Sequence, residues 1–212
     1  MVIMLFFGDS ITYGAWDLEG GWVQRLRKLL DEKQIKNTEE YYYMVYNLGI
    51  DGGDSTKLLE HFEDETRRRL WPGEETIIIF STGANDALIE IDKGKNRTSI
   101  NIFKKNIEKL IEKADKFTKK VIFVGTVPHE ESKTNPVSWD ENISYKNKDL
   151  KKYNETIKDV CSKKKVSFID VFNKLNNKDF IKTLDDGVHP NSEGHKIMFE
   201  IIKDYLIKNK IL

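Results

Sequence analysis

The chain has 212 residues, enough for one sizeable hydrophobic core, and 33% of them are charged. The 35 basic and 35 acidic side chains cancel, which argues against nucleic acid or an anionic membrane as the main partner, because both attract basic patches. No apolar run approaches the ~18 residues of a membrane span. Cys161 is the single cysteine, so no disulfide can form within the chain, and the expected location is the reducing cytoplasm.

Short apolar or β-rich runs alternate along the chain with longer segments that have the spacing of amphipathic helices. Strands are expected at Val2–Phe7, Tyr41–Tyr46, Thr76–Ser81, Lys120–Gly125 and Val166–Ile169. Helices are expected between them around Trp22–Leu30, Leu58–Phe62, Ile102–Ile111 and Lys148–Ser162, with a last one after Ser192 as far as Lys208. This alternation is typical of βαβ units. It predicts one α/β domain over residues 1–212, doubly wound around a parallel sheet.

Polar and glycine-rich segments follow several of the predicted strands. The first strand runs into "GDSITYG" (8–14), the second into "NLGIDGGDST" (47–56) and the third into "STGANDA" (81–87), while "DDGVHPNSEGH" (185–195) precedes the last helix. Each segment alone is weak evidence, because glycine and Asn-Asp pairs are ordinary turn formers and Asp86 or Ser192 could cap a helix. In doubly wound sheets, however, functional groups collect where strands end and helices begin. We therefore expect these segments to meet at one edge of the sheet.

Together these segments contain the residue types that acyl transfer needs. Ser10 can attack a carbonyl carbon if a base accepts its proton, and His189 is a suitable base. Asp186, three residues earlier, can reach the imidazole across a tight turn and hold its tautomer. Donors to the tetrahedral oxyanion would be the N–H of Ser10, an N–H of the glycine-rich loop and the amide of Asn85.

Four blocks in this order resemble the SGNH hydrolases, also called the GDSL esterase/lipase family, over nearly the whole chain. The blocks are "GDSIT", "NLGIDGGDS", "GAND" and "DGVHP". The resemblance implies a flavodoxin-like, three-layer fold with a five-stranded parallel sheet, and a serine esterase that needs no cofactor. It places the nucleophile at Ser10, an oxyanion N–H at Gly52 and the oxyanion amide at Asn85. Gly53 is the alternative donor.

The substrate that we expect is a small-molecule ester with a short acyl chain such as acetyl, and sugar O-acetyl esters and aryl esters fit equally well. The long polar segment 128–149 has the length of a lid or pocket wall. Candidate substrate contacts, each of which could equally be packing, are Trp16, His129, Trp139, Tyr145 and Val188.

The remaining histidines are not expected to be catalytic, and no metal site is expected. His61 lies among acidic residues of a predicted helix and should be solvated. His195 follows His189 by six residues, a spacing that suits neither a zinc helix nor the base. One cysteine and no tight cluster of histidines and carboxylates argue against a bound metal.

Other functions remain open on the same residues. The acyl-enzyme could pass its acyl group to an alcohol, as in an acyltransferase, or the substrate could be a lysophospholipid or thioester. A non-catalytic α/β ligand-binding protein is a further alternative, although Ser10, Asn85, Asp186 and His189 are all present. A phosphate-binding role for "GDSITYG" is disfavoured, since it lacks the Gly-Lys-Ser/Thr of a P-loop.

Overall fold

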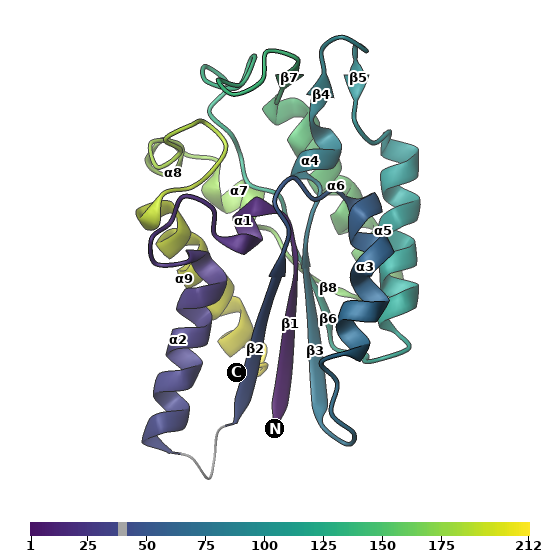
Figure 1. Ribbon diagram of the computed structural model, residues 1–212, viewed down its shortest axis with the longest axis vertical. Coiled ribbons are helices and arrows are strands. Elements are labelled where there is room, and N and C mark those ends of the chain that lie inside the picture. The colour runs from purple at the N-terminus through teal and green to yellow at the C-terminus, as the bar shows by residue number, and fades with distance from the viewer. Residues whose placement is uncertain (38–41) are drawn as a thin grey trace.

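Five parallel strands form the central sheet of this computed structural model, which describes residues 1–37 and 42–212. The strands lie in the order β2, β1, β3, β6, β8 (Figure 1). Their bounds are Val2–Gly8 for β1, Tyr43–Gly49 for β2, Glu75–Ser81 for β3, Val121–Val124 for β6 and Ser167–Ile169 for β8. This order, in which the second strand of the chain lies outside the first, is that of flavodoxin-like folds. The predicted α/β class with a five-stranded parallel sheet is confirmed, whereas the domain bounds 1–212 stay a prediction.

The second strand lies further along the chain than predicted. The sequence pattern predicts Tyr41–Tyr46, and Tyr41 lies outside the described residues. β2 pairs in parallel with the whole of β1, from Val2 opposite Tyr43 to Gly8 opposite Gly49. Pairing with β1 therefore sets the bounds of this strand, and the aromatic triplet at its start does not.

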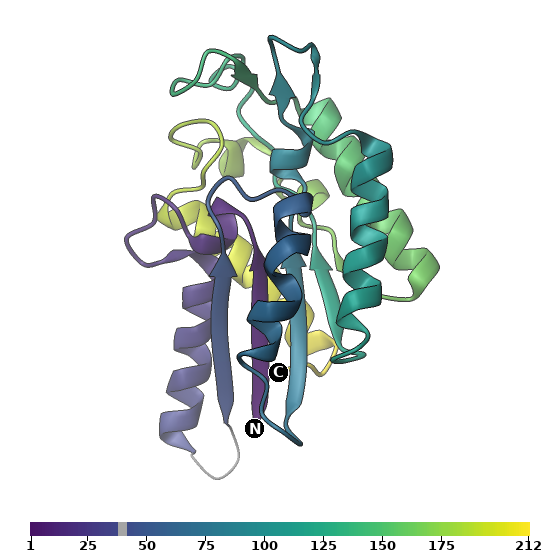
Figure 2. The same ribbon diagram turned by 45° about the vertical axis from the view of Figure 1, so that its right-hand side comes forward.

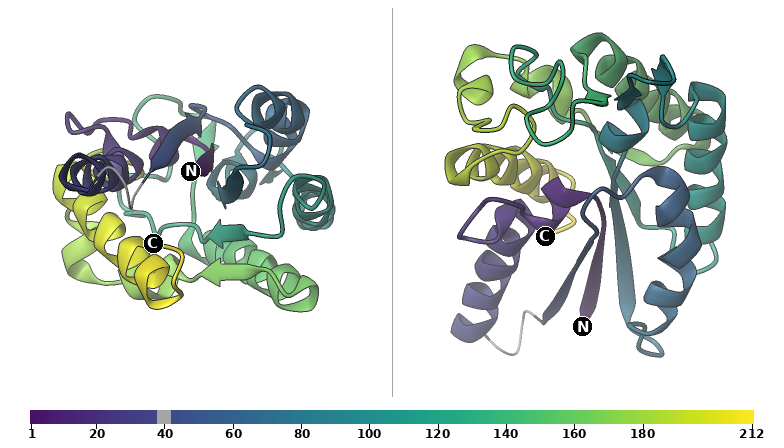
Figure 3. Two further views of the ribbon diagram at one scale, coloured as in Figure 1. Left: turned by 90° about the horizontal axis from the view of Figure 1, so that it is seen from below. Right: turned by 45° about the horizontal axis from the view of Figure 1, so that its top comes forward.

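Helices cover both faces of the sheet (Figures 2 and 3). On one face, α2 (Gly21–Lys36) and α9 (Ser192–Lys208) pack against Met4 and Phe6 of β1. The opposite face is covered by α3 (Ser55–Arg67), α5 (Ile100–Ala114) and α6 (Asn147–Lys164). Alternate residues of β1 point to opposite faces, so both apolar layers are anchored on the same central strand. None of the helices within residues 1–37 and 42–212 has the length and apolar character needed to cross a membrane.

Short elements gather above the carboxyl ends of the strands. A small sheet that the sequence pattern does not predict consists of β5 (Lys95–Asn96), β4 (Ile89–Glu90) and β7 (Ile143–Ser144) (Figure 1). Four short helices complete the fold, namely α1 (Ser10–Tyr13), α4 (Ala84–Ala87), α7 (Val171–Leu175) and α8 (Lys178–Ile181). β7 belongs to the long segment 128–149, which is thus tied by backbone hydrogen bonds to the loop after β3.

Candidate active site

Ser10 stands at the carboxyl end of β1 as the first residue of α1. Asp9 caps this helix by accepting the N–H of Ile11 at 3.0 Å. Gly8 permits the sharp turn into the helix, because a Cβ there would lie 2.4 Å from the Ser81 carbonyl oxygen and 2.2 Å from Thr12 Oγ1. The chain therefore presents the Ser10 hydroxyl at the rim of the sheet.

A continuous chain of hydrogen bonds runs from Ser10 through His189 to Asp186. Ser10 Oγ lies 2.9 Å from His189 Nε2, and His189 Nδ1 lies 2.7 Å from Asp186 Oδ2. Gly187, at φ +89°, makes the tight turn between the acid and the histidine. Asp186 Oδ1 also accepts the N–H groups of Val188 and His189 at 2.8 and 2.7 Å. The structure thus brings together the three residues that the sequence assigns to the nucleophile, base and acid.

Asp186 is held in its ionised form by the hydrogen bonds that it accepts. Burial by itself would raise the pKa of this carboxyl, but the bonds from the side chain and backbone of His189 and from the backbone of Val188 lower the pKa to about 2. A carboxylate at neutral pH can accept the Nδ1–H of His189, which leaves Nε2 free to accept the proton of Ser10.

Asn85 lies in α4 with both ends of its amide engaged. Its Nδ2 donates to the Gly53 carbonyl at 3.0 Å, and its Oδ1 accepts the hydroxyl of Tyr145 at 3.1 Å. An amide nitrogen carries two hydrogens, so the second one can be donated into the pocket that Asn85 lines. Tyr145, a candidate for either substrate contact or packing, is buried, lines the same pocket and orients this amide.

The two glycines of the second block differ in what their backbones do. Gly53 donates its N–H to the Ile50 carbonyl at 2.9 Å and is therefore already engaged. Gly52 lines the pocket at φ +64°, where a Cβ would meet no atom within 4 Å. Gly52 is accordingly the better placed of the two to offer an N–H to a bound ligand.

A buried carboxylate ties the second and third blocks together. Asp86 accepts the backbone N–H of Ser55 at 2.9 Å and its hydroxyl at 2.5 Å, and Asn106 of α5 donates to that same hydroxyl oxygen at 2.9 Å. Burial raises the pKa of Asp86 to about 6 against the opposing effect of these hydrogen bonds. The sequence left open whether Asp86 merely caps a helix and predicted no partner for it. Its partner lies 31 residues earlier, and nothing in the pattern marks the pair.

Ser10, Asn85 and His189 share a pocket of about 300 Å³. One part of the lining is apolar, formed by Leu88, Ile143 and Val188. Val188, expected as a substrate contact, is thus part of the pocket wall. The lining also includes two charged residues that the sequence did not mark as functional. Asp51 lies within the second block but has no role assigned by it, and Arg97 lies outside all four blocks.

Two exposed tryptophans flank His189. The ring centroids of Trp16 and Trp139 lie 5.8 and 5.9 Å from that of the imidazole. Trp16 Nε1 lies 3.1 Å from Asp186 Oδ2 and 3.0 Å from His189 Nδ1. Both tryptophans line the pocket, so both are placed where the sequence analysis expected substrate contacts.

Two histidines differ from expectation. His129 is 1% exposed and packs behind Tyr145 with ring centroids 4.9 Å apart, so it does not line the pocket as predicted. His61 is half-buried against the ring of Phe7, and the expectation that it is solvated is wrong. Helical spacing alone did not reveal that this face of α3 meets β1. Among the described residues, no group of three or more histidines, cysteines and carboxylates is arranged to hold a metal ion.

The comparisons with known proteins identify the family. The model of the GDSL-like Lipase/Acylhydrolase family matches residues 6–197, so the chain belongs to that family. A multidomain esterase from Ruminococcus flavefaciens is 29% identical over 230 residues, covering 94% of this chain and 28% of that protein. The chain therefore spans less than a third of the length of this curated relative.

Solved structures share the fold. A lipase/acylhydrolase from Enterococcus faecalis superimposes with a TM-score of 0.75 at 20% identity, covering 97% of this chain and 95% of that one. An acetyl xylan esterase from Geobacillus stearothermophilus gives a TM-score of 0.70 at 19% identity, covering 94% and 92%. At these identities the likeness shows the three-layer α/β fold and no more.

Proposed function

We propose that the protein is a carboxylic ester hydrolase that works through an acyl-enzyme on Ser10. The observation that carries the proposal is the chain of hydrogen bonds from Ser10 through His189 to Asp186, which ends in the same pocket as Asn85 and Gly52. Membership of the GDSL-like lipase/acylhydrolase family supports the same reaction class.

In the acylation step, Ser10 Oγ attacks the ester carbonyl carbon while His189 Nε2 accepts the hydroxyl proton. Asp186 holds the imidazole with Nδ1 protonated and stabilises the imidazolium that forms. The carbonyl oxygen becomes an oxyanion, for which the donors are the N–H groups of Ser10 and Gly52 and the free amide hydrogen of Asn85. Ser10 is the first residue of α1, so its N–H has no partner within that helix.

Collapse of the tetrahedral intermediate breaks the bond to the alcohol oxygen, which leaves with the proton from His189. Water then attacks the acyl-enzyme, again giving its proton to His189 Nε2, and a second collapse releases the carboxylic acid and restores the Ser10 hydroxyl. Each half-reaction uses the same base, the same acid and the same oxyanion donors, so one small site is sufficient for both.

The dimensions of the pocket favour a short acyl chain. About 300 Å³ has to accommodate the ester group and parts of both substituents, and the apolar wall of Leu88, Ile143 and Val188 is small. Asp51, Arg97 and the exposed tryptophan rings offer polar and aromatic contacts to the alcohol part. Acetyl esters of polar alcohols such as sugars therefore fit best, and the acetyl xylan esterase among the structural neighbours is compatible with this choice.

The proposal is tested by kinetics on p-nitrophenyl esters from acetate to octanoate, followed by acetylated sugars. We expect kcat/KM to be highest for acetate or propionate and to fall steeply beyond butyrate. A fluorophosphonate probe should label Ser10 and abolish turnover. No labelling, together with no turnover of any ester, would favour a non-catalytic ligand-binding protein.

A further inference from the structure

The backbone of Trp16 has an unusual conformation for a large side chain. It sits at φ +65°, in the left-handed region that residues other than glycine rarely adopt, and its side chain is 74% exposed. Such a conformation is energetically unfavourable for a residue with a side chain and persists only where the surroundings impose it. The exposed indole gains little from burial, so this backbone conformation must be stabilised by contacts of the loop and of the indole N–H.

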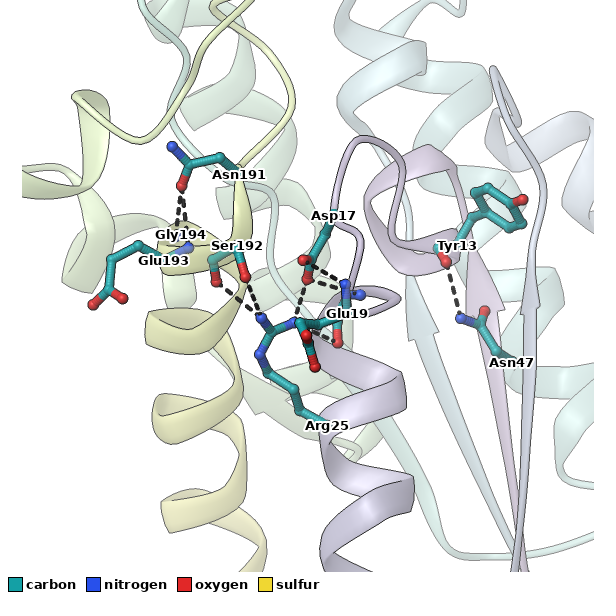
Figure 4. Close-up of polar contacts among 10 residues, drawn as sticks. Tyr13, Asp17, Glu19, Arg25, Asn47, Asn191, Ser192, Glu193 and Gly194 are labelled. Carbon is teal, nitrogen blue, oxygen red and sulfur yellow. Dashed lines mark hydrogen bonds and ion pairs between the residues drawn. The ribbon is translucent and has the colours of Figure 1, made fainter.

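The residues that follow Trp16 are fixed by a set of polar contacts (Figure 4). Asp17, whose side chain is completely buried, accepts the N–H groups of Glu19 and Gly21, both at 3.0 Å, and pairs with Arg25 of α2. Arg25 Nη2 donates in turn to the carbonyl and the hydroxyl of Ser192 at 3.1 and 2.7 Å. Ser192 opens α9, three residues after His189. Arg25 therefore clamps the loop that carries Trp16 to the segment that carries His189.

The indole N–H has two acceptors within reach, and the chemistry of the site selects one of them. His189 Nε2 must be free to take the Ser10 proton, so the ring carries its hydrogen on Nδ1 and gives it to Asp186. A protonated Nδ1 cannot accept the indole N–H. The bond at 3.1 Å to Asp186 Oδ2 remains, and the same carboxylate oxygen thereby receives the hydrogens of both His189 and Trp16.

We infer that Trp16 is a positioning residue of the catalytic unit, whose indole N–H holds the Asp186 carboxylate in the plane where it orients His189. The inference rests on the proposed esterase function and adds a fourth member to its Ser-His-Asp chain. The left-handed backbone at Trp16 and the clamp through Arg25 exist to keep this N–H in place.

The bond should also affect the acid–base behaviour of the site. A neutral donor on Asp186 Oδ2 disperses the carboxylate charge, and its N–H dipole points its positive end toward Nδ1, so both effects disfavour the imidazolium. Titratable and charged groups near His189 on other elements include Asp9 after β1, His129 after β6 and His195 in α9. Asp51 and Arg97 line the same pocket as His189. None of them is altered when the indole N–H alone is removed.

The test compares Trp16→Phe with Trp139→Phe. Phenylalanine keeps an aromatic ring and meets the same backbone cost at residue 16, so the variant isolates the N–H. Trp139 is the matched control. Its ring lies equally close to His189, but among the contacts described above only the Trp16 indole is within hydrogen-bond distance of Asp186.

With p-nitrophenyl acetate, Trp16→Phe should lower kcat about threefold to thirtyfold with little change in KM. In the plot of kcat/KM against pH, the acidic limb should move to a pH higher by about 0.3–1 unit. Trp139→Phe should change KM and leave the acidic limb in place.

An acidic limb that stays at the wild-type pH in Trp16→Phe, or that moves equally in Trp139→Phe, would overturn the inference. If Trp16→Phe does not fold, as judged by circular dichroism, Arg25→Lys provides the second test. Lysine can pair with Asp17 but cannot also reach both oxygens of Ser192, so the acidic limb should move in the same direction by a smaller amount.

The Ser10→Ala variant separates failure of this inference from failure of the proposed function. If turnover survives in Ser10→Ala, the proposed function is wrong, and this inference fails with it. If turnover is lost in Ser10→Ala but the acidic limb does not move in Trp16→Phe, the inference alone is wrong.

Discussion

Tyr145 donates its phenolic hydroxyl to Asn85 Oδ1 at 3.1 Å and thereby decides which way the amide of Asn85 faces. Because the oxygen end accepts from Tyr145, the nitrogen end is left to donate to the Gly53 carbonyl and into the pocket. Burial raises the pKa of Tyr145 well above its usual range, so the phenol keeps its proton at neutral pH. Two segments far apart in the chain thus fix the orientation of the amide that we propose as an oxyanion donor.

This relationship predicts different costs for two substitutions. Asn85→Ala removes the donor itself and should lower kcat by about 10²–10³ with little change in KM, because the charge on the oxyanion develops in the transition state. Tyr145→Phe leaves the donor but frees its orientation, and should lower kcat by about threefold to thirtyfold. Steady-state kinetics on p-nitrophenyl acetate measures both. A Tyr145→Phe variant as damaged as Asn85→Ala would mean that Tyr145 itself contacts the reacting atoms.

Two adjacent carboxylates should behave differently. Asp186 accepts the hydrogen of His189 Nδ1, whereas Asp185 accepts from Asn191 Nδ2, at 3.3 Å on the surface. Asp186→Asn should reduce kcat severely, toward the roughly 10⁴-fold seen for this change in a serine protease, and Asp185→Asn should stay within about tenfold of wild type. Equal losses, or a greater loss at Asp185, would show that the wrong acid has been assigned.

The sequence predicted those parts of the site that depend on short stretches of the chain. Apolar runs that end in small polar residues mark the carboxyl ends of parallel strands, and this places Ser10, Asn85 and the glycine-rich loop at one edge. Three-residue spacing with glycine between the partners predicted the contact of Asp186 with His189, because that geometry is local. The order of the strands followed only from the resemblance to a family.

Distant contacts outside the four blocks were beyond prediction. Tyr145 lies 60 residues from Asn85, and a tyrosine in a polar loop gives no sign that its hydroxyl is buried. The small sheet of β4, β5 and β7 has two-residue strands, too short for any alternation of apolar and polar residues to appear. His129 and His195 are almost completely or completely buried, and their neutral rings pack like apolar ones. Because histidine is a polar residue, the sequence suggested a pocket position for His129 and not a place in the packed interior.

Shortening one side chain of the apolar wall should alter acyl-chain preference. Val188 is 4% exposed and lies in a small cluster with Leu88, Val137 and Tyr145. Val188→Ala opens room for about two methylene groups next to the reacting carbonyl, so kcat/KM for butyrate relative to acetate should rise about threefold to tenfold. The same ester series measures the change. An unchanged ratio would place the acyl group elsewhere in the pocket.

Buried His195 makes the protein sensitive to mild acid. Burial lowers the pKa of His195 to about 4 in the folded chain, against 6.5 for an exposed imidazole. The unfolded chain therefore binds the proton first, and the stability that neutral His195 contributes is complete above pH 6.5 and is lost as the pH falls toward 4. The His195→Leu variant lacks this titrating group. Between pH 7 and pH 5, the free energy of unfolding of the wild type should therefore fall by about 2 kcal/mol more than that of the variant.

Urea unfolding at the two pH values measures this difference directly. Asp9 and Asp86, whose pKa values burial raises to about 6, act in the opposite direction in both proteins and cancel in the comparison. Equal falls in the free energy of unfolding for wild type and His195→Leu would mean that the imidazole is protonated or solvated within the fold.

The central claim is that Ser10 forms the acyl-enzyme, and hydrolysis of p-nitrophenyl acetate by purified Ser10→Ala measures it most directly. The pre-steady-state burst of p-nitrophenol should disappear with the serine, and steady turnover should fall by about 10⁴ or more while circular dichroism and thermal melting stay as in the wild type. Turnover within tenfold of wild type in a Ser10→Ala preparation free of contaminating esterase would contradict the account.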